Sequence, residues 1–443
     1  MSVHPVAVEL DAWIDPSQAF LQWAGRHEHC FWLDGEATES GGWSWVGIGS
    51  PADPADVLAV PLGPRAAPDW RAGRFRGGWV GWLGYEAGAA VAGAPVHRDA
   101  AEAPAAVWIR ASQWYAFDHV QQRTFFVTDA AGADAGGASP RHPMKDLGRP
   151  SALDGMQHAD PPGVMTATAR HGADEYAGLI EQCRAHIREG DAYQLCLTTR
   201  FSVIGPPVDP LAVYLRLRDG SPAPFGALVR SGEVALLSAS PERFLDVDGR
   251  RVRTSPIKGT RRRSPDPEED TALAAELVGD QKERAENLMI VDLMRNDLSR
   301  VCEPGSIGVD DLFAVHSYRQ VHQLVSTVSG TLRPGIRVAD LLAATFPAGS
   351  MTGAPKLSAM TILHRLEGAP RGIFSGCLGW IGDDGGLDLA MIIRSIVTHP
   401  GGAYVGAGGG ITWRSVATSE VAEVALKARG PLAALGAVLP DGW

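Results

Sequence analysis

The sequence predicts an α+β fold for this chain of 443 residues. Helical and strand-like apolar periods both occur, but they do not alternate in the βαβ order of a doubly wound sheet, so neighbouring strands can pair antiparallel. Hydrophobic residues make up 45% of the chain and charged residues 21%, which is ordinary for a globular protein and excludes a wholly disordered or fibrous chain. The length allows two to three domains or one large intertwined domain.

The composition changes about a third of the way along the chain. Segments 79–85 and 106–117 are rich in aromatic and small residues, which predicts strands. Between residues 129 and 163 the apolar period stops and Gly, Pro and Ser accumulate, as is typical of a loop or linker. We therefore predict an N-terminal domain over 1–130, a linker over 131–172 and a larger domain over 173–443.

The larger domain has the clearer periodicity. A helix is predicted over 174–189, where Tyr176, Ile180 and Cys183 share one face, and Gly190 ends it. The segment 281–299 is predicted to be a buried helix because it is apolar nearly all round. The remaining predicted elements are strands over 192–203, 226–237, 376–381 and 390–397, and helices over 268–278, 354–366 and 418–429, the last closed by Gly430 and Pro431.

Charge and cysteine content exclude several classes of protein. The net charge of −11 argues against a broad nucleic-acid-binding surface. The five cysteines are scattered without C-x-x-C spacing, so neither a disulfide framework nor a zinc site is indicated. The first ten residues lack the pattern of a signal peptide, and no clean apolar run of about 18 residues occurs. A cytoplasmic protein is expected.

Lysine is scarce in this chain, so each lysine is a candidate for a role that arginine cannot fill. The lysines are Lys145, Lys258, Lys282, Lys356 and Lys427, against 35 arginines. Arginine cannot lose its proton and act as a nucleophile, whereas lysine can when its pKa is lowered. Lys258 lies between Pro256 and Gly259, and Arg261–Arg263 follow, so neighbouring positive charge is expected to lower the pKa of Lys258. The sequence leaves two interpretations open, a nucleophilic amine and a solvent-exposed basic loop.

Two predicted helices carry carboxylates beside apolar runs. Glu286 lies within one turn of the apolar part of 281–299, and Glu420, Glu423 and Lys427 share a face of the last helix. Oxygen ligands without a cysteine or histidine cluster suit a hard cation such as Mg²⁺. The alternatives are a salt bridge for Glu286 and an ordinary solvated stripe for the last helix.

Two glycine-rich segments are candidates for anion binding. They are predicted as turns over 349–356 and 406–411, whose backbone amides could face a carboxylate. Arg394 stands in an apolar strand-like run, where a buried guanidinium needs an anion. A substrate carboxylate and a structural salt bridge both satisfy that need.

Taken together, these stretches resemble the chorismate-utilising enzymes from about residue 174 to 430. The family comprises anthranilate synthase component I, aminodeoxychorismate synthase component I, and the isochorismate and salicylate synthases. The matching stretches, in family order, are 238–244, 256–260, 285–297, 321–326, 349–356, the Ile-Arg pair at Arg394, and 407–411. The resemblance implies two orthogonally packed, mainly antiparallel sheets with helices outside and the active site in the cleft between them.

The resemblance also implies roles for particular residues. Pro-Ile-Lys-Gly-Thr at 256–260 is similar to aminodeoxychorismate synthase, in which the lysine attacks C2 of chorismate, the C4 hydroxyl leaves, and ammonia then adds at C4; anthranilate synthases usually carry alanine there. By motif, Lys258 and Glu242 are the catalytic residues, and Mg²⁺ is held by Glu286 and Glu423 with Glu420 beside them. The implied substrate-binding residues are His322, Thr352, Arg394, Gly408, Gly409, Gly410 and Lys427.

The nucleophile and its source follow from two further positions. Isochorismate and salicylate synthases carry a lysine base where, by alignment, Gln194 stands, and glutamine cannot act as a general base, so ammonia is favoured over water. The chain shows no Gly-x-Cys-x-Gly nucleophile elbow, since Ser375-Gly-Cys377-Leu-Gly has the wrong spacing, so ammonia is expected from a separate glutamine amidotransferase subunit. The expected pathway is 4-aminobenzoate and folate synthesis. The alternatives are anthranilate synthase, an isochorismate-type enzyme and a non-catalytic binding chain.

Overall fold

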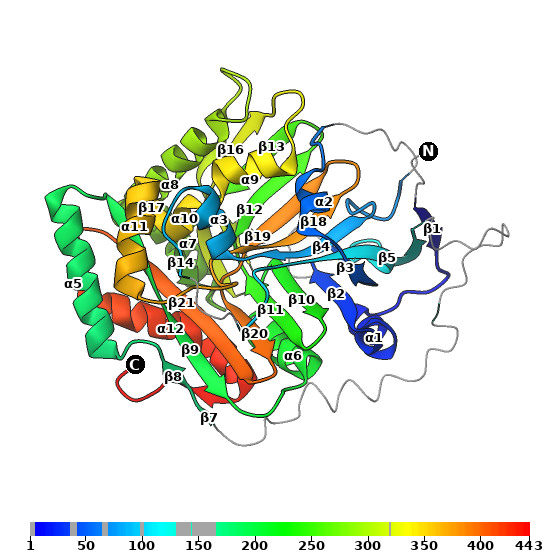
Figure 1. The fold of residues 1–443 in the computed structure, drawn as a ribbon, viewed down its shortest axis with the longest axis horizontal. Coiled ribbons are helices and arrows are strands. Elements are labelled where there is room, and N and C mark those ends of the chain that lie inside the picture. The colour runs from blue at the N-terminus through cyan, green and yellow to red at the C-terminus, as the bar shows by residue number, and fades with distance from the viewer. Residues whose placement is uncertain are drawn as a thin grey trace.

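The computed structural model describes residues 5–35, 42–63, 70–97, 102–129, 143, 165–318 and 320–443. It confirms the predicted α+β class, with helices packed around strands that pair antiparallel almost throughout (Figure 1). Most of the predicted linker over 131–172 lies outside the described residues, and its end forms the short strands β7 and β8. Among the described helices, none is both long enough and apolar enough to cross a membrane.

The helices lie mainly in the second half of the chain. They are α1 (Pro16–Gln22), the 3₁₀ helix η1 (Ala24–Arg26), α2 (Pro54–Leu58), α3 (Tyr85–Val91), α5 (Ala173–Glu189), α6 (Pro210–Gly220), α7 (Pro267–Gly279), α8 (Gln281–Ser299), α9 (Val338–Thr345), α10 (Gly349–Thr352), α11 (Lys356–Glu367) and α12 (Ala417–Leu435).

The strands are distributed along the whole chain. They are β1 (Val6–Glu9), β2 (His29–Asp34), β3 (Trp43–Pro51), β4 (Gly78–Leu83), β5 (Ala106–Asp118), β6 (Arg123–Thr128), β7 (Met165–Thr166), β8 (Thr168–Ala169), β9 (Gln194–Ile204), β10 (Phe225–Ser231), β11 (Val234–Ser240), β12 (Arg243–Asp248), β13 (Arg251–Ser255), β14 (Ile257–Arg262), β15 (Gly308–Ser317), β16 (Val321–Thr331), β17 (Gly353–Ala354), β18 (Cys377–Gly382), β19 (Leu387–Met391), β20 (Ser395–His399), β21 (Gly402–Ile411) and β22 (Ala437–Val438).

Strand pairing forms one continuous ladder with two halves. The first half runs β8–β9–β21–β20–β11–β10–β2–β3–β5. The second runs β4–β18–β19–β12–β13–β16–β15, with β14 also on β16. The long strand β5 pairs with both β3 and β4 and so joins the halves. Because β2 pairs with β10 and β4 with β18, strands from 1–130 and from 173–443 share this ladder.

Three apolar clusters hold the layers together. One lies between the two halves and includes Trp82 of β4, Val229 of β10 and Leu378 of β18. The second packs α5, α6, α11 and α12 against the first half, and the third packs α8 and α9 against the second. Figure 1 shows α5, α11 and α12 beside β9 and β21, and α8 and α9 above the second half. Helices therefore cover the outer faces of the strands.

Local sequence explains most of the element boundaries. Asp209, Asp266 and Asp280 accept hydrogen bonds from backbone amides in the first turns of α6, α7 and α8, as N-cap residues do. Gly190 adopts φ +85° directly after α5, a conformation that glycine reaches without steric cost. The predicted helix over 281–299 has the bounds of α8.

Four predicted elements differ from the structure. The predicted strand over 226–237 is the hairpin β10–β11, which turns at Gly232 with φ +62°. The predicted strand over 390–397 is broken between β19 and β20. Helix α8 is amphipathic rather than buried all round, because Leu288 is 45% exposed on its outer face. Helix α12 continues through Pro431, where buried Leu432 and Leu435 anchor the last turns in the core.

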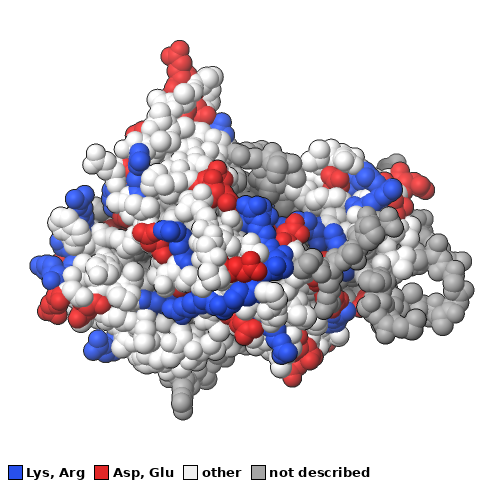
Figure 2. Space-filling view, turned by 90° about the horizontal axis from the view of Figure 1, so that it is seen from above, with Lys and Arg blue, Asp and Glu red and all other residues white. Residues whose placement is uncertain are grey.

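Charged side chains gather locally on the surface although the net charge is negative. Figure 2 shows lysine and arginine side chains forming a band across the middle of one face, with carboxylates beside it. The described arginines often pair with aspartate or glutamate, as Arg200 does with Glu102 at 2.6 Å. Opposite charges thus lie next to each other rather than in separate fields.

Candidate active site

A cavity of about 490 Å³ lies where β9, β14 and β21 meet the helices α8, α10 and α12. Nine of the predicted site residues line it: Glu242, Lys258, Glu286, Arg394, Gly408, Gly410, Glu420, Glu423 and Lys427. These residues are distributed over almost 190 positions of the chain. The fold therefore brings most of the predicted catalytic, metal-binding and substrate-binding residues to one cavity.

Glu242 is a buried carboxyl group at the cavity wall. It lies two residues after the end of β11 and is 6% exposed. Burial raises the pKa of Glu242 to about 7, and the charge of Lys258 and the hydroxyl of Ser350 oppose that rise. A carboxyl group with a pKa near neutrality can both donate and accept a proton at physiological pH, which is what a general acid–base residue requires.

Lys258 enters the cavity from β14, where the strand is irregular. Its pairing with β16 shifts register between Lys258 and Thr260, and the intervening Gly259 has φ +79°. A Cβ on Gly259 would lie 2.7 Å from Leu277 of α7, so only glycine fits this bulge without a shift. The bulge aims the lysine side chain into the cavity.

The arginines after Lys258 do not act as the sequence suggested. Arg261 pairs with Glu276 and Asp280, each at 3.0 Å, while Arg262 pairs with Glu269 at 2.9 Å and Arg263 with Asp270 at 2.8 Å. Three of these carboxylates lie on α7, and Asp280 is the N-cap of α8. The positive charge of Arg261–Arg263 is therefore compensated.

Several carboxylates lie near the Lys258 amine. Its charge opposes the effect of burial on the pKa values of Glu242, Glu283 and Glu286. The predicted electrostatic environment of uncompensated arginines is therefore wrong, because the sequence did not show that α7 folds back onto β14.

The three predicted metal-binding carboxylates face the cavity from two helices. Burial raises the pKa of Glu286 and of Glu420. Burial also acts to raise the pKa of Glu423, but Lys427 at 2.7 Å, together with Lys258 and Lys282, outweighs it, so the pKa of Glu423 is lowered. Lys282 lies 3.8 Å from Glu286. Glu286 and Glu423 thus each have a lysine partner in this structure.

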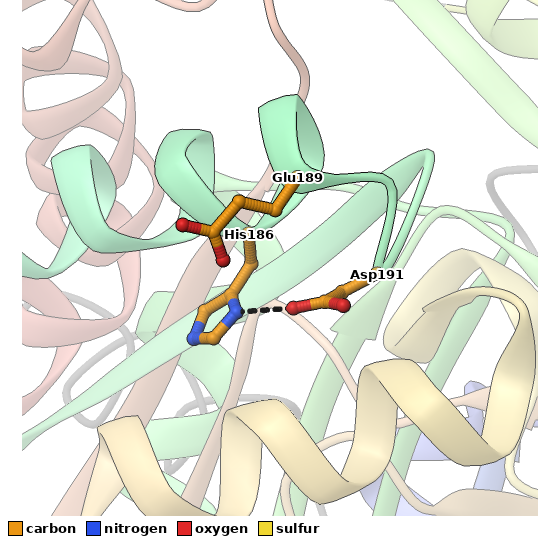
Figure 3. Close-up of side chains that lie close together, drawn as sticks. All are labelled: His186, Glu189 and Asp191. Carbon is orange, nitrogen blue, oxygen red and sulfur yellow. Dashed lines mark hydrogen bonds and ion pairs between the residues drawn. The ribbon is translucent and has the colours of Figure 1, made fainter.

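The donor set fits a hard cation, although it is spread across the cavity. Glu286, Glu420 and Glu423 offer only oxygen atoms, as Mg²⁺ prefers. Among the described residues, the one group that brings three ligand atoms within 4.8 Å of one another is elsewhere, at His186, Glu189 and Asp191. Figure 3 shows this group at the end of α5, with an imidazole nitrogen of His186 bonded to Asp191 at 2.7 Å. It lies on the surface and carries no further sign of a ligand.

Arg394 and the glycine-rich segment 406–411 differ from the predicted secondary structure. Arg394 is an exposed residue at φ +51° in the connection between β19 and β20, not a buried residue within a strand. Residues 406–411 form the end of β21 and pair with β9, so they are a strand rather than a turn. The Gly408 carbonyl accepts a hydrogen bond from Lys427 at 2.9 Å. Phe374 packs closely against this strand, because a Cβ on Gly406 would lie only 2.2 Å from it.

Three predicted substrate-binding residues do not line the cavity. His322 is buried between Ser317 and Asp270, with ring nitrogens 2.8 and 3.0 Å from their oxygens. Thr352 lies inside α10 and donates to the Ala348 carbonyl at 3.2 Å. Gly409 is also outside the lining, and a Cβ there would lie 3.3 Å from Glu420. Their positions in the motifs gave no signal of which way the side chains point.

Sequence reasoning missed several residues that line the cavity. Among them are Arg262, Lys282, Glu283, Ser350 and Phe374. Lys282 had a signal, because three of the five lysines, including Lys258 and Lys427, reach this cavity. Lys356 by contrast pairs with the buried Asp297 at 2.6 Å and fixes α11 to α8.

Comparisons with known proteins match this chain to one family of enzymes. The profile of the family described as chorismate binding enzyme matches residues 48–433. Aminodeoxychorismate synthase of Streptomyces pristinaespiralis is 37% identical over 91% of this chain and 61% of its own length. Anthranilate synthase component 1 of Streptomyces coelicolor is 36% identical over 96% of this chain and 87% of its own.

A solved structure shows the same fold over nearly its full length. Anthranilate synthase component I from Streptococcus pneumoniae matches with a TM-score of 0.73 and 28% identity, covering 96% of this chain and 98% of that one. The chain spans about three fifths of the length of the S. pristinaespiralis aminodeoxychorismate synthase. From the profile match and these alignments, the chain belongs to the family of chorismate binding enzymes.

Proposed function

We propose that this chain aminates chorismate at C4, giving 4-amino-4-deoxychorismate for 4-aminobenzoate and folate synthesis. The observation that carries the proposal is the placement of Lys258 and Glu242 in one cavity, with the pKa of Glu242 raised to about 7. A nucleophilic amine and a neutral carboxylic acid are the two groups that a covalent displacement of a hydroxyl needs.

The first half of the reaction forms a lysine adduct. The unprotonated Lys258 amine attacks C2, the ring double bonds shift, and the C4–O bond breaks. Protonated Glu242 gives its proton to the departing hydroxyl, which leaves as water. A Glu242 carboxylate remains, and the proton lost by the new secondary amine passes to solvent.

The second half reverses the displacement. Ammonia forms a bond to C4 and the electron pairs shift back. The C2–N bond to Lys258 breaks as the lysine nitrogen takes a proton back from solvent, so Lys258 leaves as a neutral amine. The Glu242 carboxylate accepts a proton from the new C4 ammonium group, which returns the acid to its starting state. Two easier displacements thus replace one difficult one.

The carboxylates of Glu286 and Glu423, with Glu420 beside them, would hold Mg²⁺. The cation supplies a positive charge that binds and neutralises a substrate carboxylate. Arg394 and Lys427 line the same cavity and offer further positive charge to the two carboxylates of chorismate. These contacts orient the ring relative to Lys258 and Glu242.

Ammonia is expected to come from a separate glutamine amidotransferase subunit. A glutaminase of that kind uses a reactive cysteine thiolate. Burial raises the pKa of the Cys377 thiol to about 12 and those of Cys30 and Cys302 to about 11, and it also raises those of Cys183 and Cys196. None of the five cysteines therefore resembles an activated nucleophile.

Product identification tests the proposal directly. The purified chain is incubated with chorismate, Mg²⁺ and an ammonium salt, and the products are separated and identified by mass spectrometry. We expect 4-amino-4-deoxychorismate without release of pyruvate. Anthranilate with stoichiometric pyruvate, or isochorismate without incorporation of nitrogen, would contradict it.

Anthranilate synthase is the second candidate, because the S. coelicolor component 1 aligns with 96% of this chain. The two activities share chorismate and ammonia, and they differ in the carbon that receives nitrogen. Lys258 favours C4, since it provides a nucleophile that direct attack of ammonia at C2 does not require.

A further inference from the structure

Gln194 has a buried side chain with no hydrogen-bond partner at either end. It is the first residue of β9 and is 0% exposed. Neither its Oε1 nor its Nε2 forms a hydrogen bond. Among the described residues, Gln194 is the one side-chain amide whose buried oxygen and nitrogen both lack a partner. Each such buried atom destabilises the fold, because its hydrogen bonds to water are lost and not replaced. An amide that remains unpaired at both ends indicates a position that a ligand completes.

The Gln194 amide lies beside the Lys258 amine. A Cβ built on Gly410 would be 2.5 Å from Gln194 Nε2 and 3.5 Å from Lys258 Nζ, so both nitrogens approach the same point next to Gly410. Gly410 and Lys258 line the cavity, as does Cys196, which follows two residues later on the same face of β9. The absence of a side chain at Gly410 leaves the space in which the amide sits.

We propose that the Gln194 carboxamide binds the ammonia nucleophile. This inference rests on the proposed function and assigns a residue to its second half. Oε1 accepts a hydrogen bond from one N–H of ammonia, which leaves the nitrogen lone pair free to attack the ring carbon. Nε2 donates to an oxygen of the bound substrate.

The position of Lys258 sets the order of events. The amide is closed to solvent while the Lys258 amine lies beside it. When the amine moves onto C2 of the ring, it leaves the neighbourhood of Gly410 and the amide becomes accessible to ammonia. A neutral amide takes no proton, so the proton released after attack goes to the Glu242 carboxylate, and water gains no general base at this position.

Steady-state kinetics with ammonium chloride test the assignment. Gln194→Met keeps the length of the side chain and removes both polar atoms. We expect at least a tenfold rise in the KM for ammonia in this variant, with a smaller change in the dissociation constant for chorismate. Gln323→Met is the matched comparison, because Gln323 lines the same cavity with an unbonded Oε1. Its effect is expected on the KM for chorismate and not on that for ammonia.

The outcomes separate this inference from the proposed function. If the unaltered chain forms no aminated product from ammonium, the proposed function fails. If the chain aminates chorismate and Gln194→Met keeps its KM for ammonia, the inference is overturned and the function stands. If Gln194→Met no longer binds chorismate, Gln194→Asn decides: a raised KM for ammonia supports the assignment and an unchanged one contradicts it.

Discussion

At the scale of single residues, the proposed reaction depends on two groups whose protonation states must differ. Glu242 has to carry a proton when the C4 hydroxyl leaves, while Lys258 has to lack one when it attacks. Burial supplies the first condition, since it raises the pKa of Glu242 to about 7. The second condition has to be met when the ring is bound, with Lys258 in the same cavity as Glu242.

Replacement of Lys258 separates a nucleophile from a positive charge. Lys258→Ala is expected to slow amination by roughly a hundredfold or more, the scale of loss seen when a participating group is removed, while chorismate binding stays nearly intact. Lys258→Arg is expected to be equally slow, because a guanidinium offers charge but no free amine. Rapid-quench kinetics and a binding titration measure both. Near-normal turnover of Lys258→Arg would show that the lysine is only an electrostatic anchor.

Glu242 should impose a pH dependence on stability. Its pKa in the folded protein lies above the unfolded value of 4.5, so the folded state binds more protons between 4.5 and about 7, and stability falls as pH rises through that window. Glu242→Gln removes this loss. Relative to the unaltered chain, we expect the variant to gain about 3 kcal/mol in free energy of unfolding between pH 4.5 and pH 8. Urea unfolding at both pH values measures it, and a pH-independent difference would contradict the expectation.

At the scale of elements, α8 and α12 bring carboxylates to one cavity from separate parts of the chain. Glu286→Gln is expected to weaken Mg²⁺ binding and to abolish activity, because it removes a charged oxygen ligand. Isothermal titration with Mg²⁺ gives a readout independent of turnover. Glu189→Gln, in the surface group at the end of α5, is the matched control and should leave Mg²⁺-dependent activity unchanged. Full activity of Glu286→Gln in the presence of EDTA would exclude a metal role.

A buried ion pair fixes α11 to the strands behind the cavity. Arg371 bonds Glu367 at 2.7 and 2.8 Å and donates to the Met351 and Cys196 carbonyls, while Glu367 accepts from Thr198. Both side chains are almost fully buried. Removing one partner leaves an uncompensated charge, so Arg371→Met should cost about 3–5 kcal/mol of unfolding free energy. The double variant Arg371→Met/Glu367→Gln should be less destabilised than the sum of the two single variants, and strict additivity would show that the pair is not coupled.

At the scale of the whole molecule, the chain is expected to use ammonia and not glutamine. Activity with an ammonium salt should rise with pH between about 7 and 9, because ammonia replaces the unreactive ammonium ion. Glutamine at the same concentration should support no turnover by the chain alone, since each of its cysteines is buried and has a raised pKa. Product formation measured with each nitrogen source checks this. Glutamine-dependent turnover would contradict a two-subunit arrangement.

The sequence by itself determined the fold class, the long helices and the residue types of the site. Periodicity and capping are local, so α5, α7 and α8 could be predicted within one or two residues. Motif order placed Glu242, Lys258, Glu286 and Glu423 in one family site, and the structure brings them into one cavity.

Only the tertiary structure decided how those residues meet and what surrounds them. Side-chain direction depends on strand register and bulges set by distant segments, so the sequence could not show that His322 and Thr352 point away from the cavity. Carboxylates, mostly from α7, compensate the positive charge of Arg261–Arg263, and the sequence could not show this because charge–charge interactions depend on distance in space and not along the chain. The two unpaired atoms of Gln194 are likewise a property of the fold, since satisfaction of a buried amide depends on every segment packed around it.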